Sequence, residues 1–504
     1  MRTEDRAAAV PPSSWAGLAC LSAGVAMLFV NTAAMNVALP DVSADLGAST
    51  AQQQWVTSAY SLVFVAILLV AGFGGDRLGH RRVLLMGLAG LLTGSALGAL
   101  SPRVGWLIAA RAIMGAGAGM FIPMSLALIA GLFPGAADRV RAMTVWTIAG
   151  TLGAPLGPVI GGGLTALAGW RAIFVLDAVA FAAVTAWALG VIPRTARTGP
   201  PGAGLPLLSA VLVAAGLGLL TAGLINGQHS WASVRAGGFA LIGLMLVVLF
   251  AVHDPRAAQP LTDLRLFSSA SFSVGALTLA TVNFSVFGLI FVLPAYLETV
   301  LDHDALTGGL LLMPLVGGAI LGSVLNEPLA RALGKAGACL GGLGLLCLGA
   351  GAMGVSTARG GLVLMGAGQA VAGFGMGAAQ PVALSWGLSQ VGGDRRGAGS
   401  SLLSALQQLG SVLGIGVLGT VQGSLYAARL LRAGVDAGPE AAGSVTIAFQ
   451  QAARLPRDTG PALRVAAGRA YTAATRACLF ACAAVAVLAL AAAWLLDHRR
   501  RSVL

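Results

Sequence analysis

Long apolar stretches recur along the whole chain, and short polar segments that hold most of the charged residues separate them. A helix needs about 20 predominantly apolar residues to cross the hydrocarbon core of a bilayer. Fourteen stretches of roughly this length follow one another, and they span residues 15–39, 54–74, 83–101, 105–125, 143–165, 172–193, 205–226, 236–253, 271–297, 306–325, 336–356, 360–381, 399–424 and 477–496. The pattern predicts an all-α polytopic membrane protein with fourteen transmembrane helices, and the even number places both termini on one side.

Two polar breaks divide these stretches into a six, two and six arrangement. One break runs from Pro193 to Pro206 and the other from Asp254 to Arg265. We expect an N-terminal six-helix bundle over 1–193, two linker helices over 194–270 and a C-terminal six-helix bundle over 271–504 with a long outer loop at about 425–476. Two such halves can pack around a cavity near the middle of the membrane.

The composition agrees with a membrane protein and narrows the possible partners. The 504 residues are 57% hydrophobic and 10% charged, whereas a soluble domain has about a quarter charged residues. The net charge of +12 could indicate nucleic-acid binding, but the basic residues are scattered between apolar stretches rather than gathered into one patch. All five cysteines lie within apolar stretches without metal-ligand spacing, so neither a metal nor another cofactor is predicted.

The distribution of basic residues predicts the topology. With the N-terminus in the cytoplasm, most arginines fall in cytoplasmic loops and tails, and the first six outer loops hold only Arg103, Arg171, Arg235 and Arg359. This bias places both termini in the cytoplasm. The last outer loop is an exception, because it carries seven arginines between Arg429 and Arg476.

A glycine- and proline-rich sequence lies within the fifth apolar stretch, where no charged residue occurs between Ala142 and Gly169. In a bilayer, glycines allow close approach of helix backbones and prolines leave carbonyl groups without helical partners. We therefore expect a bent and closely packed helix. The residues that define the pattern are Gly153, Pro155, Gly157, Pro158, Gly161 and Gly162. Their spacing resembles the fifth-helix signature of exporters of the major facilitator superfamily, which is found in proton antiporters.

The segment after the second apolar stretch resembles the loop signature of the same superfamily. Its defining residues are Gly72, Asp76, Arg77, Gly79 and Arg81. The resemblance implies a conformational latch between the two halves. An ordinary basic cytoplasmic loop would explain the arginines but not the aspartate between glycines.

Several further segments resemble the fourteen-helix drug:proton antiporter branch of this superfamily. The first stretch ends in Asn36-Val37-Ala38-Leu39-Pro40, the sixth begins at Trp170-Arg171, and the ninth ends in Leu293-Pro294-Ala295-Tyr296-Leu297. The resemblance covers nearly all of 15–496. It implies export of amphipathic, antibiotic-like compounds across a bacterial plasma membrane by alternating access, driven by inward proton movement.

Proton coupling requires a group that titrates within the membrane, and two residues are candidates. Members of this branch usually carry an aspartate in the first helix, but this chain has Asn31 at that position. Asp177 is the one acid clearly inside a predicted span, while Glu298 lies where the ninth span meets an outer loop. We therefore predict Asp177 as the proton carrier, although it could instead neutralise a nearby arginine or lie at the outer interface.

Arg111 in the fourth stretch is the predicted partner of Asp177. A lone guanidinium in a membrane costs several kcal/mol unless it is paired or hydrated. The family implies a part in proton transfer or substrate binding. The alternative is an arginine that extends to the outer interface, since it lies only six residues into its span.

Amides within apolar stretches are candidate substrate ligands, because an unsatisfied buried amide is costly. They are Asn31, Asn36, Asn283 and Gln407. Hydrogen bonds between helices are an equally good explanation for each. We expect a monomer that binds a small molecule and protons within the lipid bilayer. The alternatives are an exporter of anionic or neutral metabolites and, from another class, a channel or sensor; no enzyme motif is present.

Overall fold

The computed structural model describes residues 11–133, 135–193, 207–226, 234–257, 264–359, 361–389, 396–434, 438–456 and 459–501. Throughout these ranges the regular structure is helical. By length and composition, ten helical stretches of the described chain could cross a membrane, and two shorter apolar helices accompany them. The chain is therefore an all-helical, multi-pass membrane protein.

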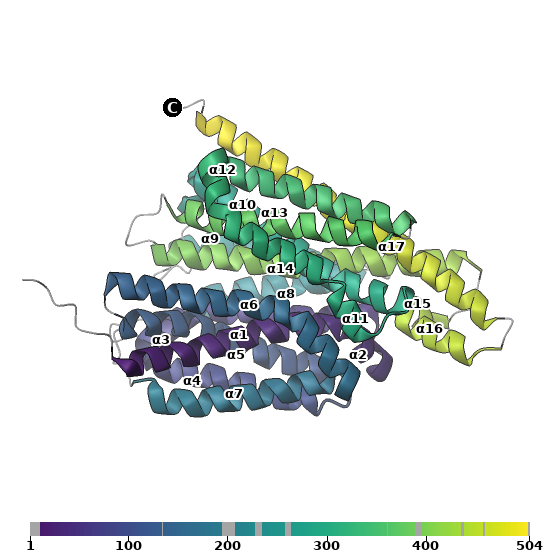
Figure 1. Cartoon of the computed structure of the whole chain (residues 1–504), viewed down its shortest axis with the longest axis horizontal. Coiled ribbons are helices and arrows are strands. Elements are labelled where there is room, and N and C mark those ends of the chain that lie inside the picture. Colours follow the sequence, from purple (N-terminus) through teal and green to yellow (C-terminus); the bar gives the residue numbers. More distant parts are fainter. Residues whose placement is uncertain are drawn as a thin grey trace, which may run out of the picture.

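The first half of the chain forms one bundle, drawn in purple to blue in Figure 1. Its helices are α1 (Pro12–Val37), α2 (Leu39–Leu46), α3 (Thr50–Leu78), α4 (His80–Ala99), α5 (Val104–Leu132), α6 (Ala136–Ala168) and α7 (Arg171–Val191). The closest pairs are α1 with α6, α4 with α5 and α3 with α5. A single residue, Gly79, separates α3 from α4, and its φ of 92° is a value that glycine adopts without steric cost.

The second half forms another bundle, drawn in green to yellow (Figure 1). Its elements are α10 (Ala270–Ala295), η3 (Tyr296–Val300), α11 (Ala305–Leu310), α12 (Met313–Arg359), α13 (Leu362–Leu388), α14 (Arg396–Arg432), α15 (Gly438–Gly443), α16 (Val445–Arg454) and α17 (Gly460–Arg501). Helix α12 bends at Gly334, which has a φ of 74°. This bend falls between the two predicted spans 306–325 and 336–356. The long α12 packs chiefly against α13 and α17.

Two helices connect the halves along the chain. Helix α8 (Leu207–Asn226) packs against α9 (Val234–His253), and α8 also contacts α3 of the first half and α14 of the second. The short helices η1 (Asp254–Arg256) and η2 (Leu264–Ser268) follow α9. The predicted break from Pro193 to Pro206 lies outside the described residues except for Pro193.

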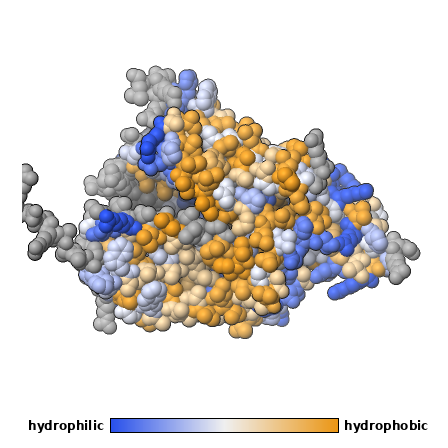
Figure 2. Space-filling view, viewed as in Figure 1, coloured by the Kyte–Doolittle hydropathy of each residue, from blue (hydrophilic) through white to orange (hydrophobic). Residues whose placement is uncertain are grey.

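The two halves meet at the end of the molecule that carries α2, α11, α15 and α16, which we call the capped end. Here α6 contacts α11, and α2 contacts α16. Figure 2 shows the surface hollowed between the halves towards the opposite end. The molecule is thus closed at one end and more open at the other.

Much of the segment predicted as the last outer loop, about 425–476, is helical. Helix α14 continues to Arg432, α17 begins at Gly460, and α15 and α16 lie between them. The arginines interrupt the apolar pattern in this region but do not end the helices, because arginine has a high intrinsic helix propensity. Most of the segment is therefore a helical cap rather than an irregular loop.

Candidate functional site

A network of three buried polar side chains connects α1, α5 and α7 inside the first bundle. Arg111 on α5, Asp177 on α7 and Asn31 on α1 are 1%, 0% and 1% exposed. The Arg111 Nη1 atom donates a hydrogen bond to Asn31 Oδ1 at 2.6 Å, and Asn31 Nδ2 donates to Asp177 Oδ2. The Asn31 amide therefore lies between a guanidinium and a carboxylate and uses its oxygen for one and its nitrogen for the other.

The remaining surface of the Arg111 guanidinium is held by α3. The Nε atom donates to the carbonyl oxygen of Val56 at 3.2 Å, and the Cζ atom lies 4.5 Å from the centre of the Tyr60 ring. Such contacts compensate part of the cost of burying a charge. Arg111 is thus enclosed by three helices and does not extend to an interface.

Asp177 is only partly satisfied. Its Oδ2 atom accepts from Asn31, whereas its Oδ1 atom is buried without a hydrogen-bond partner. Among the described residues, no ion pair within 4 Å joins Arg111 directly to Asp177, so the predicted pairing is mediated by Asn31. A carboxyl group with one unoccupied buried oxygen can accept a proton without losing an existing hydrogen bond.

The glycines of the fifth-helix signature lie against α1. A Cβ atom on Gly157 would lie 2.4 Å from the Ala33 Cβ atom, and one on Gly161 would lie 2.6 Å from the Ala34 Cα atom. Gly153 and Gly162 are also buried, and the side chain of Pro155 lies outside the described part. Helix α6 continues through both prolines. The glycine face therefore fixes the segment of α1 that carries Asn31.

The same helix also contacts the other half of the molecule. A Cβ atom on Gly309 of α11 would lie 2.5 Å from the carbonyl oxygen of Pro158. Pro158 is buried at this contact. The signature on α6 thus contacts α1 within its own bundle and α11 of the second bundle, which closes the capped end.

The residues of the predicted latch surround the turn between α3 and α4. Arg81 Nη2 donates to the carbonyl oxygen of Leu189 on α7 at 2.8 Å, a contact within the first bundle. Gly72, Asp76 and Arg77 belong to the last two turns of α3, and the side chain of Asp76 lies outside the described part. The latch between the halves stays a prediction.

The predicted substrate ligands lie in different places. Asn36 lines a small cavity at the capped end. Asn283 donates to Leu279 of its own helix at 2.9 Å, and Gln407 lies half-buried on α14. Asn31 belongs to the charged network instead and does not line this cavity.

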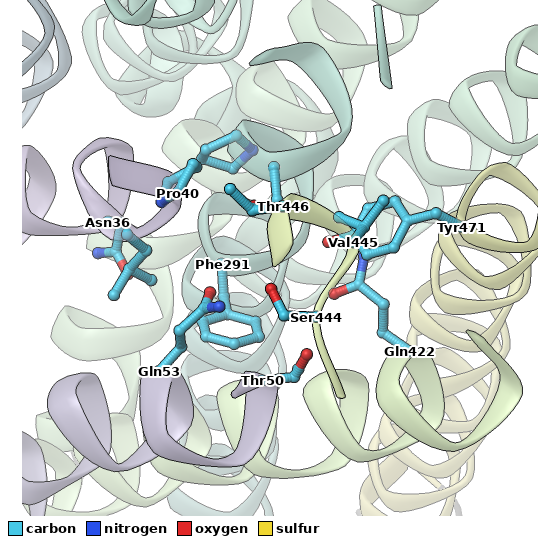
Figure 3. A pocket seen from close by; sticks show the side chains of 13 residues that line it. Asn36, Pro40, Thr50, Gln53, Phe291, Gln422, Ser444, Val445, Thr446 and Tyr471 are labelled. Atoms are coloured by element: carbon cyan, nitrogen blue, oxygen red, sulfur yellow. The ribbon is translucent and has the colours of Figure 1, made fainter. Parts of the chain in front are cut away.

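Residues that were not predicted complete this cavity. Figure 3 shows Asn36, Thr50 and Gln53 from the first half facing Gln422 and Tyr471 from the second, with Ser444 between them. The Ser444 hydroxyl lies 2.9 Å from that of Ser43 on α2. The available sequence signal for Gln422 was an amide within an apolar stretch, whereas Gln53 lies just before the stretch 54–74. Only the packing of the two halves brings them together.

Comparisons with known proteins agree with this architecture. The family model of the Major Facilitator Superfamily matches residues 21–415. The chain is 30% identical over 469 residues to the multidrug efflux pump LfrA of Mycolicibacterium smegmatis, covering 92% of both proteins. It is 34% identical to the cephamycin export protein CmcT of Amycolatopsis lactamdurans, covering 79% of this chain and 83% of that protein. It is also 29% identical to the puromycin resistance protein of Streptomyces alboniger, covering 86% and 87%.

A solved structure shares the fold. The bacterial homologue of the human lysosomal transporter Spinster, in an inward-facing and unoccupied conformation, superposes with a TM-score of 0.71. The two chains are 17% identical, and the match covers 97% of each. With the family model matching most of the sequence and relatives matching nearly its whole length, the chain belongs to the major facilitator superfamily.

Proposed function

We propose that this protein exports amphipathic, antibiotic-like compounds across a bacterial plasma membrane in exchange for protons. The observation that carries the proposal is the buried network of Asn31, Arg111 and Asp177, which places a titratable group inside the bundle. Relatives that match most of the chain are named for multidrug efflux, cephamycin export and puromycin resistance. These names support a drug-like cargo.

The proposed topology has fourteen transmembrane helices with both termini in the cytoplasm. Helix α12 supplies two of the fourteen, because it bends at Gly334. The halves are 1–193 and 271–504, joined by the two helices of 194–270. The excess of arginines near the α3–α4 turn supports placing that end in the cytoplasm and the capped end outside.

In this orientation the structure corresponds to an inward-facing carrier. Cargo enters the hollow between the halves from the cytoplasm, while the contact between Pro158 and Gly309 keeps the outer end closed. Export requires that this contact open and that the halves approach each other at the cytoplasmic end. The residues from Gly72 to Arg81 then act as a latch that stabilises one of the two states, the inward-facing or the outward-facing one.

Proton coupling follows from the charge balance of the network. With Asp177 ionised, the pair of Arg111 and Asp177 is neutral; with Asp177 protonated, one positive charge remains. A cationic cargo about 10 Å away would then be repelled by roughly 1.7 kcal/mol at an effective dielectric constant of about 20. Proton and cationic cargo therefore disfavour each other's binding, which is the requirement for exchange.

The Asn31 amide explains how this chain works without an acid in its first helix. The carboxylate is on α7, and Asn31 connects it to Arg111 on α5. A change of charge at Asp177 alters hydrogen bonds to α1, which packs on the glycine face of α6. The proton site is thus linked mechanically to the helix that closes the outer end.

Accumulation assays in a bacterial host without its own efflux pumps test this proposal. A panel of cationic, neutral and anionic amphipathic compounds is measured with and without a protonophore. We expect lower accumulation of some compounds than in cells without the protein, and loss of this difference with the protonophore. The Asp45→Asn variant is a matched control for Asp177→Asn, because it makes the same change at an exposed position. Export that persists without a proton gradient would contradict proton coupling, and a response limited to anionic metabolites would favour the alternative cargo.

A further inference from the structure

Glu298 is a second buried acid, and it lies at the capped end, far along the chain from the Asp177 network. It belongs to η3, it is 9% exposed, and its Oε1 atom is buried without a hydrogen-bond partner. Among the described residues, no basic group lies within 4 Å of its carboxylate. The Glu298 carboxylate therefore lacks the neighbouring positive charge and amide donor that Arg111 and Asn31 provide for Asp177.

The Glu298 side chain packs directly behind the contact that joins the halves. A Cβ atom on Gly308 would lie 2.7 Å from Glu298 Cγ and 3.0 Å from its Oε1 atom. The next residue, Gly309, approaches the carbonyl oxygen of Pro158 on α6. Helix α11 is therefore held between the Glu298 carboxyl group and the signature helix of the first half.

A second acid approaches Glu298 from the other half. Asp41 on α2 lies close enough to exert a repulsive electrostatic effect on Glu298, and its Oδ2 atom is also buried without a partner. Burial raises the pKa of Asp41. Asp304 at the start of α11 adds a further negative charge, although it is exposed to solvent.

The surrounding elements offer little compensating charge. The elements packed on η3 are α10, α11, α16 and α17. Their titratable and charged residues on this side, with those of η3 and the adjacent turn, are Tyr296, Asp302, His303, Asp304, Arg454, Arg464, Arg469, Tyr471 and Arg476. Arg464 pairs with Asp302 at 3.2 Å, and His303 Nε2 is buried without a hydrogen-bond partner. On α2, Asp45 pairs with Arg171.

We infer that Glu298 is a second proton-binding site, and that a proton bound there holds the outer end closed. An ionised carboxylate at this buried position loses its hydration and is repelled by the charge of Asp41. A proton on Glu298 removes both penalties and lets α11 remain against α6. When external pH rises and the proton dissociates, opening the outer end hydrates the carboxylates and separates the halves that carry them.

This inference rests on the proposed orientation and alternating access, but not on the role of Asp177. The Glu298 site would lie at the outer end, where cargo is released. External pH would there control the opening of the outer end rather than the binding of cargo. Low external pH should favour closure of the outer end after cargo has left. The direction of transport would then depend on proton binding at two separated positions.

The test is the accessibility of a cysteine introduced at Gln53, which is 8% exposed and lines the closed outer cavity. Whole cells carry the Gln53→Cys change in an Asp177→Asn background, so titration of Asp177 cannot contribute. A membrane-impermeant maleimide is added outside without any cargo, and the chain without the added cysteine corrects for native thiols. Because the reactive thiolate fraction also rises with pH, each labelling rate is divided by the rate of the Glu298→Gln variant of the same chain at the same pH. We expect this ratio to rise by up to about tenfold per pH unit for one linked proton as external pH is raised, within the range where the site titrates.

Substitutions at the site decide the outcome. Glu298→Gln should label more slowly than the parent at high pH, and its remaining rise with pH should be that of the thiol alone, because a neutral amide keeps the closed state. Glu298→Asp should retain the pH dependence, and so should Asp304→Asn, which changes an exposed acid while keeping a side-chain acceptor at the start of α11. Equal pH dependence in Glu298→Gln and the unsubstituted parent would overturn the inference. Since no cargo is present, this result is independent of whether Asp177 couples transport.

Discussion

The first half of the molecule buries opposite charges between its helices, whereas the buried charged side chains of the described second half are acids near helix ends. Arg111 and Asp177 are enclosed by α1, α3, α5 and α7, with Asn31 between them. In the second half, the buried charged residues are Glu298 and Asp497, and its central buried amides include Gln369. In the proposed mechanism the first bundle holds the energy-coupling group, while the second supplies the surface that moves against it.

Removing Arg111 should have the largest effect on the stability of the first half. Arg111→Leu leaves the Asp177 carboxylate buried without its positive partner, which costs about 3–5 kcal/mol in a buried pair. The double variant Arg111→Leu/Asp177→Leu should recover much of this loss, because no uncompensated charge remains. Thermal unfolding of purified protein measures both. A double variant no more stable than Arg111→Leu would mean that the guanidinium acts mainly through packing.

Adding a methyl group to the glycine face should have the next largest effect. Gly157→Ala places a Cβ atom 2.4 Å from Ala33 Cβ, so α1 and α6 must move apart. Overpacking of this kind costs about 1–3 kcal/mol. Gly163→Ala on the same helix is the matched control, since no atom lies within 4 Å of its added Cβ. Similar unfolding midpoints and export activities for the two variants would refute the packing role.

Removing the buried amide of Gln369 from the second half should stabilise the protein slightly. Both polar atoms of the Gln369 side chain are buried without partners, and such groups cost about 1–3 kcal/mol. Gln369→Leu should therefore raise the unfolding midpoint. Gln54→Leu should lower it, because Gln54 Nε2 donates to Ile415 across the interface between the halves at 3.2 Å. A loss of export in Gln369→Leu without a loss of stability would assign Gln369 a direct role in transport.

The smallest effect should follow loss of an exposed ion pair in the first half. Arg171 Nη1 lies 2.6 Å from Asp45 Oδ2, and this hydrogen bond lowers the pKa of Asp45. A lowered folded-state pKa stabilises the fold above the unfolded value of about 3.9, and the contribution is lost as pH falls through the folded value. Asp45→Asn should remove about 0.2–1 kcal/mol at neutral pH and nothing in strong acid. An equal loss at both pH values would exclude an electrostatic origin.

The apolar pattern predicted most of the architecture. The stretch 271–297 nearly coincides with α10, and the kink of α12 falls between two predicted spans. The pattern failed where α14 and α17 extend beyond the apolar region, because helices continue through polar residues when the cap supports them. Burial in a cap of α15 and α16 cannot be recognised from local hydrophobicity.

The sequence also singled out Arg111 and Asp177, but it did not predict how they are joined. Asn31 was assigned to the substrate cavity, since an isolated amide in an apolar stretch has no visible partner. Its position between Arg111 and Asp177 depends on the packing of α1, α5 and α7 and on the glycine face of α6. Tyr60 over the guanidinium was missed for the same reason.

Cargo-induced proton movement in proteoliposomes tests the central claim most directly. Purified wild-type protein, Asp177→Asn and the control Asp45→Asn are reconstituted with an internal pH indicator, and a compound identified in the accumulation assays is added. We expect wild type and Asp45→Asn to exchange protons for cargo, and Asp177→Asn to reduce this exchange by about a hundredfold or more, the scale of a lost acid–base group. The double exchange Asn31→Asp/Asp177→Asn should restore part of it, because the carboxylate stays within the same network. Undiminished proton movement in Asp177→Asn would contradict the account.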